Sequence, residues 1–361
     1  MLSRNVTHLT PANVQINPRE AGGRGGNAMT TMRDVANLAN VSVTTVSATL
    51  SGAAPVADAT RARVWEAVRQ ANYRPDGVAR NFRKGVSTTI GLIVPDIAVP
   101  WAAHLAGAMQ RTLADGGFNM LFASNEDDPD RERRDIDLMA DQRVAGLILA
   151  PTSVRPDDAA ALAARLPPAA VLVDRTVPGL DRDAATDDNA LGARLLAEYL
   201  HRLGHRDVAF LAGRPSISAS SERLAGFRAA AARAGAALDD GLVREGVWKR
   251  GQAYAAVQAL MSRPRPPTAI ACITIAQLLG TMEGLKNLGL RVPDDVSVVS
   301  FDGFHPAEGW FPSITSLEQD TAALAQTAVD LLIGRIGGRR GAPTHERIPP
   351  RLVLRESCAA R

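Results

Sequence analysis

Charged, polar and aromatic side chains follow several β-rich runs of this 361-residue chain, at places where a small molecule could be bound. The candidates for effector binding are Asp96, Trp101, Asp174, Arg175, Arg223, Trp248, Thr274 and Asp302. Aromatic rings stack on one face of a ring-shaped ligand, and carboxylate and guanidinium groups form hydrogen bonds around its edge. This mixture suits a polyhydroxylated ring such as a sugar. Singly, each residue is ambiguous, because a lone tryptophan is more often core and a lone aspartate or arginine is more often half of a surface pair.

Catalytic and cofactor motifs are missing from the sequence. No GxGxxG follows an expected strand, and neither a GxxxxGK[ST] loop nor a GxSxG elbow occurs. His201 and His205 are four residues apart without an evident third ligand, which favours a surface pair over a metal site. We therefore expect no catalytic residue, metal or cofactor. A dehydrogenase or a nucleotide-using α/β enzyme is the alternative that these absences disfavour.

Alternating elements predict an α/β body of two doubly wound parallel-sheet lobes, like that of a periplasmic binding protein. The expected strands are Ile90–Pro95, Asn119–Ala123, Gly146–Ala150, Ala170–Val173, Val208–Ala212, Ala269–Ile273 and Val296–Phe301. Apolar residues at helical spacing separate them. The body is expected over 89–355, with the first lobe at about 89–188 and 316–343 and the second at about 189–315 and 344–355. Ligands of such sheets bind at the carboxyl ends of the strands.

Positive charge is concentrated near the N-terminus. Eight lysine and arginine residues stand against four acidic ones between Thr30 and Ser87, whereas the whole chain carries only +3. A basic head on a mildly acidic body is typical of a protein that meets phosphate at one end. Residues 1–29 are polar and rich in glycine and proline, and we expect a disordered tail there.

Residues 30–75 have the pattern of an all-α helix-turn-helix head. Thr31 is placed to cap a first helix with Asp34 answering it, and Asn40 stands where the chain must turn sharply. Ser42 is placed to cap a second helix, Val43–Leu50. This geometry lets a second helix enter the major groove of DNA. An ordinary helical hairpin is the alternative.

The chain resembles the LacI (lactose-repressor) family over roughly residues 30–355. The motifs that carry the resemblance are Met32–Ala36, Val41–Ser47, Leu50–Gly52, Asn72–Arg80, Ile90–Pro95, Gly146–Leu149, Val173–Arg175, Arg223–Phe227, Val298–Asp302 and Pro312–Ser316. The resemblance implies a transcriptional repressor that binds operator DNA as a homodimer under the control of a small molecule. It also implies ligand-binding roles for Arg223 and Asp302.

By the same resemblance Val43, Thr44 and Ala48 occupy the base-facing positions of the second helix. Family members commonly carry arginine where Ala48 stands; arginine can bind guanine bidentately, and alanine offers at most a methyl contact with thymine. The other residues expected at the DNA, at phosphates or as caps, are Thr31, Ser42, Thr45 and Ser47.

Residues 76–88 are interpreted as a hinge. Pro75 is expected to end a third helix, and a short segment, Gly77–Arg83, follows it. By the resemblance such a segment folds only beside its twin on DNA, with Val78 and Arg80 at the DNA and Phe82 as an apolar wedge in the minor groove. A linker whose Phe82 packs on the body is the alternative.

The expected effector is a sugar or a sugar acid. The family usually has an Asn-Asp pair where this chain has Thr274-Ile275, so a carboxylate acceptor is lost. Together with Arg175, Arg223, Lys249 and Arg250, this loss suggests a ligand with negative charge. A periplasmic sugar-binding protein is the rival for the body, but it needs a signal peptide. The chain shows no secretory h-region and no apolar run long enough for a membrane span, and its two cysteines suit a reducing compartment, so we expect a cytoplasmic protein.

Overall fold

The computed structural model describes residues 30–52, 54–73, 87–152, 158–303 and 312–361. It divides into two compact units, Met1–Val86 and Ser87–Arg361, which are treated separately here. The expected tail and most of the expected hinge, including Val78, Arg80 and Phe82, lie outside the described residues. No helix in the described ranges combines the length and apolar character that a membrane crossing requires.

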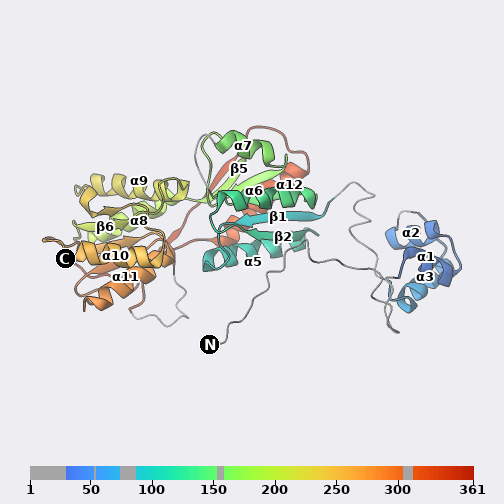
Figure 1. Cartoon of the computed structure of the whole chain (residues 1–361), viewed down its shortest axis with the longest axis horizontal. Helices are drawn as coiled ribbons and strands as arrows, with labels where there is room; N and C mark the ends of the chain where they lie inside the picture. Colours follow the sequence, from blue (N-terminus) through green and yellow to red (C-terminus); the bar gives the residue numbers. More distant parts are fainter. Residues whose placement is uncertain (1–29, 53, 74–86, 153–157, 304–311) are drawn as a thin grey trace, which may run out of the picture. The chain divides into compact units, whose positions relative to one another are not determined.

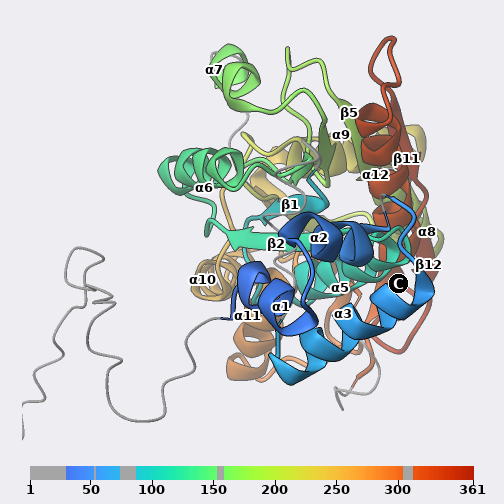
Figure 2. The ribbon, with the colours of Figure 1, turned by 90° about the vertical axis from the view of Figure 1, so that its right-hand side faces the viewer.

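The described residues of the N-terminal unit form three helices, α1 (Met32–Ala39), α2 (Val43–Ser51) and α3 (Asp58–Gln70), drawn in blue in Figures 1 and 2. Thr31 and Asp34 form a reciprocal capping box at the start of α1. Asn40 ends that helix in the left-handed region, with φ 50° and ψ 53°. Ser42 then caps α2 by accepting a hydrogen bond from the backbone N–H of Thr45. The predicted helix, tight turn and helix are confirmed.

A small apolar core joins these helices, with Val35 from α1, Val46 from α2, and Val64 and Val68 from α3. Leu50 packs against the same core. Because Val46 and Leu50 are four residues apart, they lie on one face of α2, and the opposite face is left to solvent.

The end of the third helix was predicted incorrectly. α3 ends at Gln70, well before Pro75, because Asn72 turns to a φ of 47° and the backbone N–H of Tyr73 bonds back to the Val68 carbonyl at 3.0 Å. A left-handed residue with a backward hydrogen bond is a common way to close a helix without proline.

The first sheet of the body has six parallel strands in the order β11-β5-β4-β3-β1-β2. They are β1 (Thr89–Val94), β2 (Asn119–Ser124), β3 (Gly146–Leu149), β4 (Ala170–Val173), β5 (Asp183–Asp187) and β11 (His345–Ile348). On one face lie α5 (Pro100–Asp115) and α12 (Thr321–Ile336). On the other lie α6 (Pro129–Asp141) and α7 (Asp158–Arg165). Figure 1 shows α5 and α6 on opposite sides of β1 and β2.

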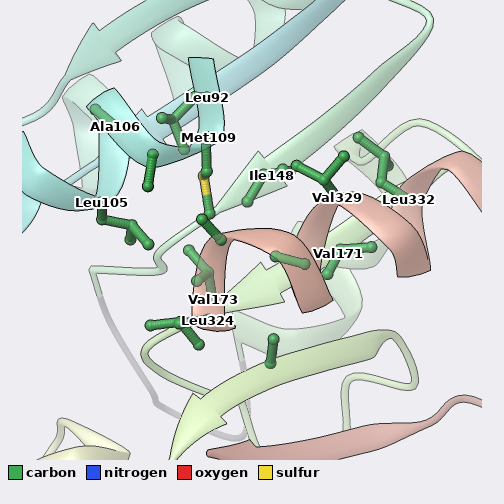
Figure 3. Close-up of a cluster of buried hydrophobic side chains, with 14 of the residues drawn as sticks. Leu92, Leu105, Ala106, Met109, Ile148, Val171, Val173, Leu324, Val329 and Leu332 are labelled. Carbon is green, nitrogen blue, oxygen red and sulfur yellow. The ribbon is translucent and has the colours of Figure 1, made fainter. Parts of the chain in front are cut away.

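The core between this sheet and its α5–α12 face is continuous and apolar. Figure 3 shows Leu92 and Ile148 of the sheet packed with Met109 of α5 and with Leu324 and Val329 of α12. Strands buried on both faces need nearly unbroken apolar runs, and β1, β3 and β4 have them.

The second sheet has the order β12-β10-β9-β8-β6-β7. Its strands are β6 (Val208–Leu211), β7 (Val243–Arg244), β8 (Ala269–Cys272), β9 (Ser297–Ser300), β10 (Thr315–Glu318) and the antiparallel β12 (Arg351–Val353). α8 (Asn189–Arg202) and α9 (Ser218–Arg233) cover one face, and α10 (Arg250–Met261) and α11 (Ile275–Asn287) cover the other. A short 3-10 helix, Asp240–Leu242, precedes β7. The predicted fold class, a helical head with two parallel-sheet lobes, is confirmed.

The boundaries of the two lobes differ from those predicted near the C-terminus. β10 pairs with β9 and so belongs to the second lobe, although its residues from 316 onward were assigned to the first. β11 pairs with β5 and belongs to the first lobe, although it was assigned to the second. Residues 356–361 also belong to the second lobe, where Ser357 bonds Val298 and Thr315. The sequence of β11 is difficult to recognise as a strand, because three of its residues are exposed at the edge of the sheet and the strand has no apolar run.

Candidate functional site

The side chains on the outer face of α2 are short, and none of them is charged. Val43 and Thr44 are exposed, and Ala48 is half-buried one turn later on the same side. Val43 is 41% exposed, which is high for an apolar side chain at the start of a helix. Small and apolar groups on an exposed helix suit contact with base edges in a groove, where a methyl group reads thymine.

The other residues predicted at the DNA are used within the head itself. Thr31 and Ser42 are exposed N-cap residues, and the Ser42 hydroxyl lies 2.9 Å from that of Thr45. The Ser47 carbonyl accepts the Ser51 hydroxyl at 2.7 Å. These contacts give the side chains of Thr31, Ser42 and Thr45 structural roles, whereas Ser47 takes part through its backbone carbonyl. Contact of the four residues with phosphate stays a prediction.

In the body, the loops after the first sheet's strands build a network around Arg175. This arginine is 5% exposed, and its Nη1 donates to Asp127 at 2.7 Å and to the Pro151 carbonyl at 3.2 Å. Its Nε donates to Asp174 at 3.2 Å. Asp174 adopts a φ of 65°, a left-handed conformation that is costly outside glycine and is often found at functional sites. The guanidinium of Arg175 is therefore neutralised by carboxylates of its own lobe.

Glu132 of α6 adjoins this network. It is 6% exposed and accepts the backbone N–H of Thr152 at 2.7 Å. Burial raises the pKa of Glu132 to about 7, against the lowering effect of Thr152 and Arg175. The group is therefore partly protonated at neutral pH.

The second lobe presents Arg223 at its own carboxyl edge. Arg223 is 6% exposed, and its Nε donates to Asn189 at 2.9 Å while Nη1 donates to the Ile273 carbonyl at 2.8 Å. The guanidinium carbon lies 3.7 Å from the centre of the Phe301 ring. Asp302 follows at 3.8 Å from Nη1, so the predicted pair of Arg223 and Asp302 is brought together.

Two carboxyl groups near Arg223 have raised pKa values. Burial is the main cause for Asp187, and repulsion from Asp174, Asp302 and Asp320 adds to it, so its pKa rises to about 7 although Arg223 opposes the shift. Burial likewise raises the pKa of Asp302 to about 6. Perturbed carboxyl groups gather at functional sites more often than elsewhere, which supports a binding role for this edge.

Trp248 lies between two arginines. The guanidinium carbon of Arg175, from the first lobe, is 5.8 Å from the ring centre, and that of Arg214, from the second, is 5.7 Å away. Arg214 also approaches Asp127 of the first lobe at 4.0 Å. The backbone N–H of Thr176 donates to the Ser218 hydroxyl at 2.9 Å. These contacts bring the carboxyl ends of the two sheets together.

Buried polar atoms without a hydrogen-bond partner concentrate at the carboxyl edge of the first sheet. Of the nine such side-chain atoms among the described residues, five belong to Trp101, Asn125, Thr152 and Asp187. These four residues follow or end different strands or open α5. Buried polar groups are nearly always satisfied in proteins, so a cluster of unsatisfied ones marks the place where a polar ligand or water completes the structure.

The contacts of three predicted effector residues give less support to a binding role. Asp96 is exposed and accepts the backbone N–H of Ala98 at 2.8 Å within its own loop. Thr274 caps α11 by accepting the backbone N–H of Gln277. Trp101 packs against the core of the first lobe, and only its unpartnered Nε1 points to ligand binding.

The positive charge on which a sugar acid was predicted is largely neutralised. Arg175 has two carboxylate partners, and Arg250 pairs with Glu283 at 2.8 Å on the exposed surface. Lys249 is exposed at the start of α10. The structure therefore removes the charge argument for an anionic effector.

Several site residues were missed by sequence reasoning. Asp187 escaped because β5 reads Asp-Ala-Ala-Thr-Asp, which lacks the apolar run of a buried strand. Asn189 is the first residue of α8 and was assigned only to that helix. Glu132 and Arg214 lie on segments whose patterns resemble ordinary solvated surface.

In the described part of the chain, no cluster of three or more His, Cys, Asp or Glu side chains could hold a metal ion. A cavity of about 240 Å³ lies beside α9 in the second lobe, between Gly213, Leu224, Arg228 and Glu245. It contains none of the predicted effector residues.

Comparison with known proteins assigns this architecture to a family. Residues 31–76 match bacterial regulatory proteins of the lacI family, and residues 197–358 match a periplasmic binding protein-like domain. The HTH-type transcriptional repressor PurR of Escherichia coli is 30% identical over 332 residues, which are 92% of this chain and 97% of PurR. The chain belongs to the LacI family. As a LacI-family member it is a DNA-binding transcriptional repressor with an effector-binding domain, and not an enzyme.

Two solved structures of LacI-family regulators resemble the chain over most of its length. The lac repressor dimer bound to operator and the anti-inducer ONPF aligns with a TM-score of 0.82 at 28% identity, covering 91% of this chain and 99% of that one. The transcriptional regulator CelR in complex with cellobiose aligns with a TM-score of 0.67 at 29% identity, with the same coverage.

Proposed function

We propose that this LacI-family repressor binds operator DNA as a homodimer through α2 and the hinge. A sugar-like effector that binds between its two lobes lowers or raises its affinity for the operator. The observation that carries the effector part is the group of unpartnered buried polar atoms at the carboxyl edge of the first sheet, opposite Arg223 and Asp302. Ligands of doubly wound sheets bind at this edge.

The ligand is proposed to be a sugar or a close derivative because the edge combines an aromatic ring with hydrogen-bonding groups. Trp248, which Arg175 and Arg214 approach, supplies an aromatic ring, and Asp187, Asp302 and Arg223 supply acceptors and donors at the carboxyl edges of the two sheets. One solved relative supports this class, since it is described as a complex with cellobiose.

The allosteric step is proposed to be closure of the lobes. A ligand that touches both carboxyl edges stabilises their closed arrangement by its differential affinity. The cross-lobe contacts Arg214–Asp127 and Thr176–Ser218 belong to that arrangement. If closure alters the hinge, the coupling to DNA binding is typically about 1–3 kcal/mol.

The experiment combines DNA binding with sedimentation. Purified full-length protein is titrated onto DNA from upstream of its own gene and onto random DNA, with and without a panel of sugars. We expect a specific complex on a near-palindrome with half-site centres about 10 bp apart, and a dimer in solution. Equal affinity for the two DNAs would overturn the repressor role, and tight DNA binding by a sedimenting monomer would overturn the dimer.

A further inference from the structure

Asp187 is a buried carboxyl group with no hydrogen-bond partner among the described residues. It is 1% exposed, and both Oδ1 and Oδ2 are unpartnered. The residue ends β5, where the chain passes from the first lobe into α8 of the second. Ionisation of a carboxyl group in this state is energetically costly, because burial removes its water and no donor among the described residues replaces it.

The charges that face Asp187 come from several elements and do not neutralise it. Asp174 follows β4, Asp302 follows β9 and Asp320 precedes α12, and all three repel it. Arg223 of α9 is the cation that opposes them. Its Nε and Nη1 are already committed to Asn189 and Ile273, and its nearest carboxylate contact is with Asp302.

The position of Asp187 makes it part of the effector site. It lies two residues before Asn189 of α8, whose side chain accepts a hydrogen bond from Arg223 of the second lobe. Asp187 is also close enough to Arg223 and Asp302 to interact with them electrostatically. The unpartnered Nε1 of Trp101 and Oγ1 of Thr152 lie along the same edge of the first sheet. A buried acceptor at the boundary of the two lobes, without a hydrogen-bond partner among the described residues, can accept hydrogen bonds from a ligand.

The charge balance then selects the kind of ligand. Asp127 and Asp174 neutralise Arg175, and Arg223 stands among Asp187, Asp302 and Asp174. A ligand carboxylate would add another anion to a buried group of carboxyls and would be repelled by them. Hydroxyl and ammonium groups, in contrast, donate hydrogen bonds to carboxylates.

We propose that Asp187 binds the effector directly, accepting hydrogen bonds from the hydroxyl or ammonium groups of a neutral sugar or an amino sugar, and that the site rejects sugar acids. This inference rests on the proposed function, because it concerns the effector of the same inter-lobe site. It reverses the preference for an acidic ligand that the sequence suggested.

The first test is a thermal-shift panel at pH 7 with matched sets of three sugars: glucose, glucosamine and glucuronate, then galactose, galactosamine and galacturonate. We expect a neutral or amino member to raise the melting temperature of the wild-type chain, and its acid to raise it less. If the amino sugar raises the melting temperature more than its neutral parent does, the donor to Asp187 is an ammonium group. If the neutral parent raises it more, the donors are hydroxyl groups. A larger shift with the acid overturns the inference, as does a chain that responds to none of the six.

Variants assign the effect to Asp187. Asp187→Asn keeps one acceptor oxygen and should reduce the ligand-induced shift, and Asp187→Ala should abolish it. Asp183→Asn on the same strand is the matched control: it breaks ion pairs with Arg335 and Arg339, so it should lower the melting temperature but keep the ligand-induced shift. A full ligand response in Asp187→Ala would overturn the inference.

Two further readouts separate this inference from the proposed function. Without ligand, Asp187→Asn should melt at a higher temperature than wild type at pH 8 and show a smaller gain at pH 5, because the substitution removes an unpaired buried charge. No gain at pH 8 would mean that Asp187 is satisfied and would overturn the inference. Specific binding to upstream DNA tests the repressor role independently, so a chain that binds DNA and prefers an acid fails only the inference.

Discussion

Asp183 and Asp187 begin and end the same strand, β5, and are both buried, yet they have opposite environments. Asp183 receives hydrogen bonds from the side chains of Arg335 and Arg339 and from the backbone N–H of Thr344. Asp187 receives none from the described residues. Because residues four apart in a strand point to the same face, the difference comes from what covers each end of that face. α12 and the segment after it cover Asp183, whereas Asp187 lies where the chain passes into α8 of the second lobe.

Asp183→Asn should destabilise the body in a pH-dependent way. Burial alone would raise the pKa of Asp183, but hydrogen bonds from Arg335, Thr344 and Arg339 lower it to about 2. The stabilisation is therefore complete above the unfolded pKa near 4 and is lost as the pH falls toward 2. A shift of that size corresponds to about 2 kcal/mol in the free energy of unfolding. Urea unfolding at pH 7 and pH 3 measures it, and an equal loss at both values would contradict the assignment.

Asp302→Asn should weaken the response to effector and leave operator binding near that of wild type. The amide keeps the size of the side chain and an acceptor for the Ile275 N–H, so the fold is preserved. A lost hydrogen bond to a charged group costs about 1.5–3 kcal/mol, or roughly ten- to a hundredfold in effector affinity. Titration of effector against a preformed protein–operator complex measures this.

Arg223→Ala should abolish the same response, but it also removes buried hydrogen bonds to Asn189 and Ile273. The thermal stability of the Arg223→Ala variant therefore has to be measured together with its effector response. An unaltered effector response in the Asp302 and Arg223 variants would show that the effector binds elsewhere.

Arg214→Ala should raise the effector concentration needed for half response several-fold. Arg214 contacts Asp127 and the Trp248 ring, so its loss removes a contact between the lobes in their closed arrangement. Arg228→Ala is a suitable control, because that arginine pairs with Asp240 within the second lobe. Isothermal titration of both variants tests the difference; identical affinities would mean that Arg214 does not hold the lobes together.

Ala48→Arg should change the operator preference. Ala48 lies on the outer face of α2 beside Val43 and Thr44, where a longer side chain has room to reach a base edge. A bidentate contact with guanine is worth about 1–3 kcal/mol of discrimination. Selection of binding sites from random DNA by the two proteins should show a gain of guanine at one symmetric pair of positions. Unchanged selected sites would place Ala48 away from the bases.

Phe82→Ala tests the hinge, which lies outside the described residues. If Phe82 wedges into the minor groove, its loss should cost a few kcal/mol of operator affinity and reduce DNA bending. Non-specific binding should barely change, since it depends on lysine and arginine contacts with phosphate. Gel-shift titration and a bending assay measure both. Unchanged affinity and bending would support the alternative of a packed linker residue.

The sequence alone determined the helix-turn-helix head and the repeated strand–helix order of the body. Capping by Thr31, Asp34 and Ser42 and the turn at Asn40 are local, because each depends on residues within a few positions. The apolar runs of β1, β3 and β4 are equally easy to recognise in the sequence, because strands buried on both faces need them.

Only the tertiary structure decided which charges at the site are free. Arg175 and Asp127 are 48 residues apart in sequence and pair at 2.7 Å, so the count of arginines in the sequence overstated the unpaired positive charge at the site. The polar strand β5 and the edge strand β11 are held by pairing with distant segments, and local patterns did not identify them. Asp183 and Asp187 are the same residue type on one strand, and what lies across from each depends on long-range packing. That packing gives one a structural ion pair and leaves the other unpaired at the inter-lobe site.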